Sequence, residues 1–496
     1  MAEERTSVRD VQVRDFLPWL SLFRAFGIAI DPRKLLLAAA GLMVMGAGWW
    51  LLGGLFDWVS SDPNVEQQAV EMRRWAWEDS TRTTFSVPAM PDQEQFLDQI
   101  QDQLKPAARD TIRARLGEKK RFDMLPELMH SPIQTLWRLA TNWRYVLRPY
   151  EDLLRPFRTI FSRGWGFVPV VFAFLSGVWA VVVWAFFGGA ITRIAAVQFA
   201  RDEKISLREA ISFARSRYLS YVGGPVIPLG FIGFLAVFCL LGGSLSVIGW
   251  GIGRNIGPVI AGLLWFLPLV AGFVMAIILL GWAVGWPLMF STISVEGSDT
   301  FDAISRSYAY VFQRPWHYLF YAIVLVIFGS LCSFFVVLLG DLLVHLSLWA
   351  VALGAAWTQS WPDWLVEKRA LELIHQLTYY APPASGWQVR DVAGQKIDEP
   401  TGAAWFGAVC SGVWLYLLFL LLAGFVYSYF WSASTAMYYL LRRDVDNTEL
   451  EEVYLEGAED DFEPPGQEGL GGASGGGASE RQPSGVGPSP TPTSPK

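Results

Sequence analysis

Two ionisable residues inside an apolar run are the first candidates for chemistry in this chain. Asp341 and His345 are four positions apart, so a helix would place both side chains on one face. Ionisable groups at membrane depth are costly and often functional, and histidine can change its charge near neutral pH. The pair predicts a proton or cation site; the alternative is an interfacial pair that marks the end of a membrane span.

Sequence motifs of known catalytic sites are absent. The chain contains no G-x-x-x-x-G-K-[ST], no H-E-x-x-H and no G-x-S-x-G, and its four histidines are scattered. Cys239, Cys332 and Cys410 all fall in apolar runs, which favours packing over a disulfide or a zinc site. We therefore expect no metal, no cofactor and no enzymatic activity.

The composition indicates that membrane helices position these residues. Of 496 residues, 52% are hydrophobic and only 17% are charged, and runs of about 20 apolar residues can span a bilayer. The net charge of −7 gives no reason to expect a nucleic-acid partner. We expect an all-α polytopic membrane helix bundle with six spans, at about 35–56, 166–190, 225–249, 259–290, 318–340 and 404–440.

Two short connectors between spans repeat one another. Both contain the sequence Ala-Ile-Ser, at 210–212 and at 303–305. Each begins with a side chain that can cap a helix and an acid three residues later: Ser206 with Glu209, and Asp299 with Asp302. The pattern predicts a capped helix in each connector.

The connector helices have two possible roles. They can pack under the spans and fix the geometry of the hairpins. Alternatively, the first connector presents Arg208 and Arg215 to anionic lipid headgroups or to an acidic partner.

Basic residues in the connectors predict the topology. By the positive-inside rule, both connectors and both chain ends are expected on the cytoplasmic side of a bacterial inner membrane. The expected order is a cytoplasmic amphipathic segment 1–34, a first span 35–56, an extracytoplasmic helical domain 57–164, a five-helix membrane domain 165–440 with connectors 193–224 and 291–316, and a disordered cytoplasmic tail 441–496, acidic and then rich in Gly, Ser and Pro.

Two segments flanking the first span invite membrane-surface interpretations. Asp15–Phe26 predicts either a short interfacial helix with Arg24 facing lipid phosphates or a plain linker. Residues 57–104 have a net charge of −7 and residues 105–164 one of +7, so these halves can fold together as a helical cap. Alternatively, arginines near the second span hold anionic headgroups, with Arg148, Arg155 and Arg158 as candidate contacts.

The apolar run that begins at residue 318 is too long for one crossing. It continues to Trp357, and a single helix of that length would be about twice as long as the hydrocarbon layer is thick. We expect a break near Asp341, followed by an interfacial helix over 341–357 or by a seventh crossing. In the tail, residues 444–463 contain ten acids and no base, which predicts docking to a protein partner or to Arg208 and Arg215 of the chain's own first connector.

The first connector resembles a coupling element of transporters. Arg193–Val222 resembles the cytoplasmic coupling loop of ABC-transporter permeases through Glu209-Ala210-Ile211, but Arg215 occupies the position of that family's glycine. The glycine permits a sharp turn in the permeases, so the resemblance implies no coupling role for this chain.

Two further resemblances concern larger parts of the chain. Ser206–Ser212 and Asp299–Ser305 are similar to the membrane domain found beside some bacterial glycerophosphodiester phosphodiesterases, a likeness that covers roughly 190–330. The catalytic domain has no counterpart, so phosphodiesterase activity is not implied. A group of uncharacterised bacterial six-span membrane proteins is also similar, at Asp31–Lys34, Arg215–Tyr221 and Tyr310–Tyr318.

These patterns favour a non-catalytic membrane protein that acts as a scaffold, organises lipid or assists a membrane complex. The alternative is a transporter or channel subunit with a hairpin repeat around a substrate pathway. A polar cavity at mid-membrane favours the transporter, and a solid apolar bundle favours the scaffold.

Overall fold

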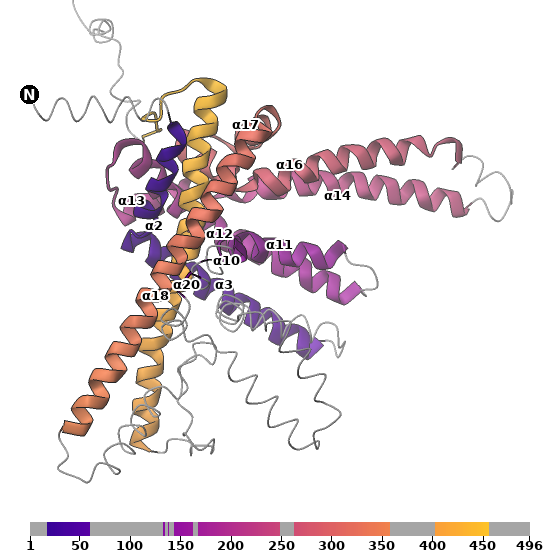
Figure 1. The fold of residues 1–496 in the computed structure, drawn as a ribbon. Coiled ribbons are helices and arrows are strands. Elements are labelled where there is room, and N and C mark those ends of the chain that lie inside the picture. Colours follow the sequence, from indigo (N-terminus) through magenta and orange to yellow (C-terminus); the bar gives the residue numbers. More distant parts are fainter. Residues whose placement is uncertain are drawn as a thin grey trace, which may run out of the picture. The chain divides into compact units, whose positions relative to one another are not determined.

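Every regular element that the structure describes is helical, as the sequence predicts (Figure 1). The computed structural model describes residues 17–59, 132–133, 137, 143–161, 167–248, 262–357 and 402–455. The chain divides into Met1–Tyr454 and Leu455–Lys496, and all the helices belong to the first unit. The predicted disordered tail lies outside the described residues from 456 onward.

Within the described residues, six helices are long and apolar enough to cross a membrane, which makes this a multi-pass membrane protein. Each overlaps one of the spans predicted from sequence. They are α3 (Pro32–Val59), α12 (Phe167–Arg201), α14 (Tyr218–Ile248), α16 (Phe266–Glu296), α18 (Pro315–Trp357) and α20 (Ala403–Asp446). Several continue past the predicted boundary, because polar residues such as Arg193 and Gln198 prolong the helix after the apolar run has ended.

Both predicted connector helices form, with the predicted caps. In α13 (Leu207–Ser216) the Ser206 hydroxyl accepts from Glu209 N at 3.2 Å, and in α17 (Thr300–Gln313) the Asp299 carboxylate accepts from Asp302 N at 2.9 Å. Each connector helix packs back against the span that precedes it, α13 on α12 and α17 on α16. We call the end of the bundle at which α13 and α17 lie the connector end.

The spans that surround the connectors pair in two long hairpins. In Figure 1, α14 and α16 run side by side, and α18 runs beside α20, as their contacts require. Gly281 and Gly285, the small-residue pair in α16, lie under α17, against Tyr308 and Val311. The close approach that this spacing allows is therefore used within the chain.

The expected break near Asp341 is absent. One helix, α18, runs without interruption from Pro315 to Trp357, a length of about 65 Å at 1.5 Å per residue. Long apolar side chains keep good helix propensity through Asp341 and His345, so two polar residues do not end the helix. Both α18 and α20 are longer than a bilayer core is thick, so they tilt in the membrane or extend beyond it.

Part of the expected extracytoplasmic cap packs instead among the spans. Helices α10 (Trp143–Val146) and α11 (Arg148–Phe161) contact α12, α18 and α20. Tyr150 donates from its hydroxyl to Ala283 O at 2.5 Å and stacks on Trp286, both within α16. Buried Leu153 joins the main core. Of residues 60–142, only 132, 133 and 137 are among the described residues.

The predicted interfacial helix near the N-terminus is present as two short turns that pack on the bundle. They are η1 (Pro18–Phe23) and α2 (Arg24–Ala29), and Phe23 and Phe26 meet Phe328 edge to face. The expectation that Arg24 faces lipid phosphates is wrong. Its guanidinium pairs with Asp202 and lies over the Phe199 ring, because the end of α12 is beside it.

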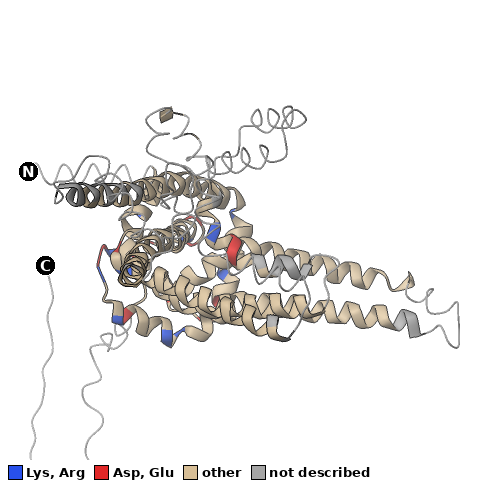
Figure 2. Ribbon diagram, turned by 90° about the horizontal axis from the view of Figure 1, so that it is seen from below, with Lys and Arg blue, Asp and Glu red and all other residues tan. Residues whose placement is uncertain are grey.

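Charge and burial are both concentrated at the connector end. Figure 2 shows the charged residues gathered there, while the described parts of the α14–α16 hairpin are without charge until Glu296. Apart from Ser176, the buried polar residues of α12, α16 and α20 lie in the halves of these helices nearer that end. The outer halves of α14 and α16 expose apolar side chains such as Phe234 and Phe273, as lipid-facing helices do.

Candidate functional site

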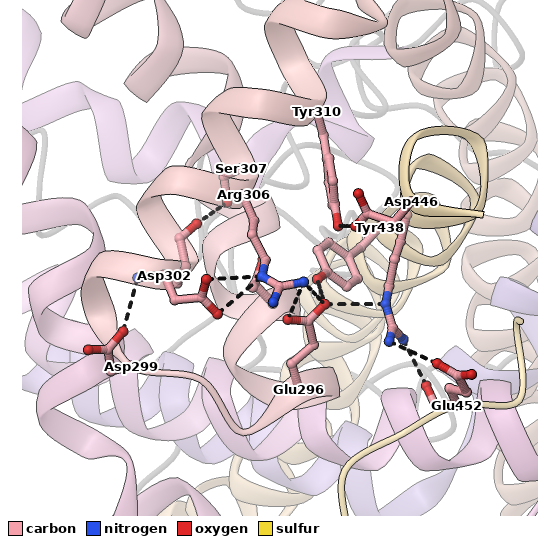
Figure 3. Close-up of polar contacts among 12 residues, drawn as sticks. Glu296, Asp299, Asp302, Arg306, Ser307, Tyr310, Tyr438, Asp446 and Glu452 are labelled. Carbon is pink, nitrogen blue, oxygen red and sulfur yellow. Dashed lines mark hydrogen bonds and ion pairs between the residues drawn. The ribbon is translucent and has the colours of Figure 1, made fainter. Parts of the chain in front are cut away.

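The candidate site is centred on Glu296, the last residue of α16 (Figure 3). Its side chain is 10% exposed and accepts a hydrogen bond from the Tyr438 hydroxyl at 2.6 Å. Arg306 reaches it from α17 with Nη1 at 2.9 Å, and Arg442 reaches it from α20 with Nε at 3.2 Å, an ion pair outside hydrogen-bond geometry. One carboxylate thereby joins the ends of three helices.

Local sequence explains why Glu296 points into this junction. The residue after the helix, Gly297, adopts φ +62°, a left-handed conformation that glycine accepts without strain. The chain then turns at once to Asp299, the cap of α17. Asp302, in the first turn of that helix, accepts twice from Arg306 Nε, at 3.0 and 3.1 Å, and so orients the guanidinium towards Glu296.

Tyrosine–carboxylate pairs extend the network to the end of α20. The Tyr310 hydroxyl donates to Asp446, and the Tyr321 hydroxyl donates to Asp444 at 2.8 Å. Burial raises the pKa of Tyr310 above its ordinary value, and the hydrogen bond to Asp446 raises it further. This phenol therefore stays protonated and remains a donor at neutral pH.

The first connector is held by a different cluster, centred on Arg193 in α12. This arginine is 3% exposed, donates from Nη1 to Ser294 O at 2.8 Å and lies 4.1 Å above the Phe213 ring of α13. The Ser294 hydroxyl in turn lies 2.6 Å from Thr192 Oγ1 and 2.8 Å from the Tyr221 hydroxyl. Three spans, α12, α14 and α16, meet in these contacts.

A buried lysine joins the first span to the same end of the bundle. Lys34 in α3 is fully buried and donates from Nζ to Gln198 Oε1 at 2.8 Å. Gln198 donates from Nε2 to Asp31 Oδ2 at 2.5 Å. The basic residue at the start of the first span is thus used inside the protein, where a buried ammonium requires such polar partners.

The chain after α20 folds back over the Glu296 network. We call residues 447–455 the strap. Tyr454 N donates to Val295 O at 2.7 Å, and a Cβ placed on Gly297 would lie 2.6 Å from the Tyr454 ring. Arg442 donates from Nη1 to Glu452 O at 2.9 Å and pairs through Nη2 with the Glu452 carboxylate at 3.3 Å. The beginning of the acidic stretch 444–463 therefore docks on the second connector, within the same chain.

An open pocket of about 550 Å³ lies between the strap and the helix ends. Three arginines from three different helices line it, together with Glu296 and strap residues. Cations and anions therefore face each other across an open volume at the connector end. Such an arrangement can bind a charged group.

The remaining residues predicted from sequence are placed as follows. Arg208 and Arg215 are exposed on α13, so the docking surface proposed for them is accessible. Arg148 is directed inward instead: its side chain is 12% exposed and pairs with Asp152 at 3.5 Å. Asp152 also accepts from the Tyr427 hydroxyl at 2.6 Å, which ties α11 to α20.

For four of the predicted residues the structure describes the backbone but not the side chain. The backbone places Arg155 and Arg158 in α11, and Asp341 and His345 in α18. The four-residue spacing of the last pair is kept within one helix. Whether this pair holds a proton or a cation stays a prediction.

Glu296, Tyr438, Arg442 and Lys34 were not singled out from the sequence. A signal was available, because each is a polar residue at the end of an apolar run. Arg442 and Lys34 flank apolar runs, and their burial depends on segments far away in the chain.

Comparisons with known proteins leave the family open. The chain matches no family model, no curated protein and no solved structure at a significant level. Within the described part of the chain, no cluster of three or more His, Cys, Asp or Glu residues could hold a metal ion.

Proposed function

We propose that this chain is a non-catalytic integral membrane protein that acts as a scaffold, a lipid-organising protein or an accessory component of a membrane complex. We place it in the bacterial cytoplasmic membrane, with its connectors and both termini on the cytoplasmic side. The basic residues of α13 support this orientation.

The observation that carries the proposal is the solid interior where α11, α12, α14 and α16 meet. The cavity there has a volume of only about 20 Å³, and its walls are apolar. Its lining residues are Leu153, Leu154, Val181, Trp184, Pro225, Trp282, Trp286 and Phe290. A water molecule needs polar partners and about this much space, so this junction supports packing rather than passage.

The polar groups at the connector end support the same proposal. Glu296 and Arg193 both make contacts that join helices. Groups committed to holding helices together favour a rigid platform. Arg208 and Arg215 then serve as the accessible contacts for anionic lipid or an acidic partner, and the acidic residues beyond the strap, up to residue 463, serve a protein partner.

Affinity purification in mild detergent tests the proposal. We expect the full chain to retain a specific protein or lipid, and we expect Arg208→Gln with Arg215→Gln to reduce that retention. A matched variant, Arg314→Gln, removes one exposed charge from the second connector. Equal retention by all three proteins contradicts the docking role of α13.

A transporter or channel subunit is the second candidate, and one observation favours it. The order of long helix, capped short helix and long helix occurs twice, in α12–α13–α14 and α16–α17–α18. Transporters are often built from such repeats around a pathway. Proteoliposomes test this candidate: ion or proton flux that Asp341→Asn abolishes supports it, and flux equal to that of empty vesicles removes it.

A further inference from the structure

The pocket beneath the strap has an arginine whose binding face is already occupied by an acid of the same chain. Arg442 is 12% exposed and is fixed on its Nε side by Glu296. On the opposite side, Nη1 donates to the backbone carbonyl of Glu452, and Nη2 pairs with the Glu452 carboxylate. The guanidinium is therefore oriented for an anion, and the Glu452 carboxylate occupies the position of one at Nη2.

A second arginine in the same pocket is not occupied in this way. Arg201 is the last residue of α12, lies exposed and lines the pocket. Among the residues that the structure describes, no ion pair involves Arg201. Two guanidiniums can share one phosphate, since each offers parallel N–H donors to its oxygens.

The ion pair between the Glu452 carboxylate and Arg442 is the contact that an anionic ligand can replace. The Glu452 side chain is 58% exposed, and exposed ion pairs contribute little to stability. Tyr454 holds the strap separately, through its backbone bond to Val295 and its ring on Gly297. The carboxylate can therefore leave Arg442 while the strap stays anchored two residues further on.

We propose that this pocket binds the phosphate group of an anionic ligand between Arg201 and Arg442, in exchange for the Glu452 carboxylate. The pocket lies where α12, α16 and α20 end, which is the level of lipid headgroups for helices that span a membrane. A lipid headgroup and free phosphate share this chemistry. The lipid source deepens the lipid-organising part of the proposed function and rests on it; the phosphate site itself does not.

Native mass spectrometry of the full chain in detergent tests the proposal, with phosphatidylglycerol, phosphatidylcholine and inorganic phosphate as probes. Arg201→Gln is expected to lower phosphatidylglycerol occupancy about five- to tenfold, the scale of a lost charge-assisted contact. Lys204→Gln removes an exposed charge from the same end of the bundle and serves as the matched control.

The strap gives a second pair of variants with the opposite sign. Glu452→Gln is expected to raise occupancy up to about fivefold, because an exposed ion pair no longer competes with the ligand. Glu449→Gln, an equal change of charge at an exposed strap residue outside the pocket lining, is expected to leave occupancy unchanged.

The outcomes separate the two sources and the two proposals. Retention of phosphatidylglycerol over phosphatidylcholine, undiminished by inorganic phosphate, supports a lipid headgroup. Binding of inorganic phosphate with the same dependence on Arg201 and Glu452 supports free phosphate. Equal binding by Arg201→Gln and Lys204→Gln, or no rise with Glu452→Gln, overturns the site. Partner retention is measured separately, so the scaffold role can fail while the phosphate site stands.

Discussion

The two connector helices begin with the same kind of cap, but different side chains hold them against the bundle. Counted from the caps Ser206 and Asp299, the seventh residue is Phe213 in α13 and Arg306 in α17. Phe213 is buried against the Arg193 guanidinium, whereas Arg306 is 40% exposed and pairs with Glu296. The same turn of the same kind of helix is thus held by a buried aromatic ring against a guanidinium in one connector and by ion pairs in the other.

This difference teaches which features are local and which depend on distant segments. Caps and helix starts depend on neighbours three residues away, and they are the same in both connectors. The face that packs inward is chosen by the surroundings. At α17 the end of α20 and the strap supply Arg442, Tyr438 and Glu452, and polar residues are retained there.

The largest expected loss of stability comes from removing the buried aromatic ring of the first connector. Phe213→Ala is expected to destabilise the protein by about 3–5 kcal/mol, because it opens a cavity and uncovers the buried Arg193. Its positional match, Arg306→Ala, is expected to cost only about 1 kcal/mol, since that ion pair is partly exposed. Tryptophan fluorescence during unfolding in detergent measures both. Equal losses contradict the comparison.

The next effect is confined to the charged connector. Glu296→Ala is expected to cost about 3 kcal/mol, because Arg442 then remains buried beside a missing acid. Glu203 stands at the matching position, three residues before the first cap, and is exposed. Glu203→Ala is expected to change stability by less than about 0.5 kcal/mol. A similar cost for both acids rules out the Glu296 network as a support.

Substitutions at the residue that follows each preceding span are expected to have a smaller effect on stability. Gly297→Ala is expected to cost about 1–2 kcal/mol, because alanine resists a positive φ, and its methyl group displaces the Tyr454 ring. Asp202, at the end of α12, also has a positive φ, of 57°, which aspartate and asparagine adopt more readily than most other residues. Limited proteolysis reports the strap: we expect faster cleavage near residue 455 in Gly297→Ala and no change in Asp202→Asn.

The smallest effect tests the similarity rather than the difference. Ser206→Ala and Asp299→Ala each remove one capping bond and are expected to cost about 1 kcal/mol apiece. Ser212→Ala, at an exposed site of α13, is the control. Unfolding curves of the three variants decide whether the two caps are equivalent.

The sequence was sufficient for the features that depend on short distances. Runs of apolar residues identified all six spans, and Ser206 and Asp299 identified the start of each connector helix. The break near Asp341 was wrong, because chain length beyond a bilayer thickness does not itself end a helix. The contacts of α11 with the spans were not predicted, because they involve Tyr427 and Trp286, far along the chain.

The candidate site was less accessible to sequence reasoning. Arg24, Lys34 and Arg442 are basic residues next to apolar runs, and such residues ordinarily remain in water at the interface. Their burial or pairing depends on Asp202, Gln198 and Glu296, each more than a hundred residues away. A single sequence contains no record of those pairings.

The position of Tyr454 has a consequence for biogenesis. Its backbone bond to Val295 and its ring against Gly297 complete the second connector with a residue that leaves the ribosome about 150 positions later. The first connector needs only segments made before it and the nearby ends of α14 and α16. During synthesis the first connector can therefore complete its contacts before the second one. The second connector lacks its contacts with Tyr454 until α20 has been inserted.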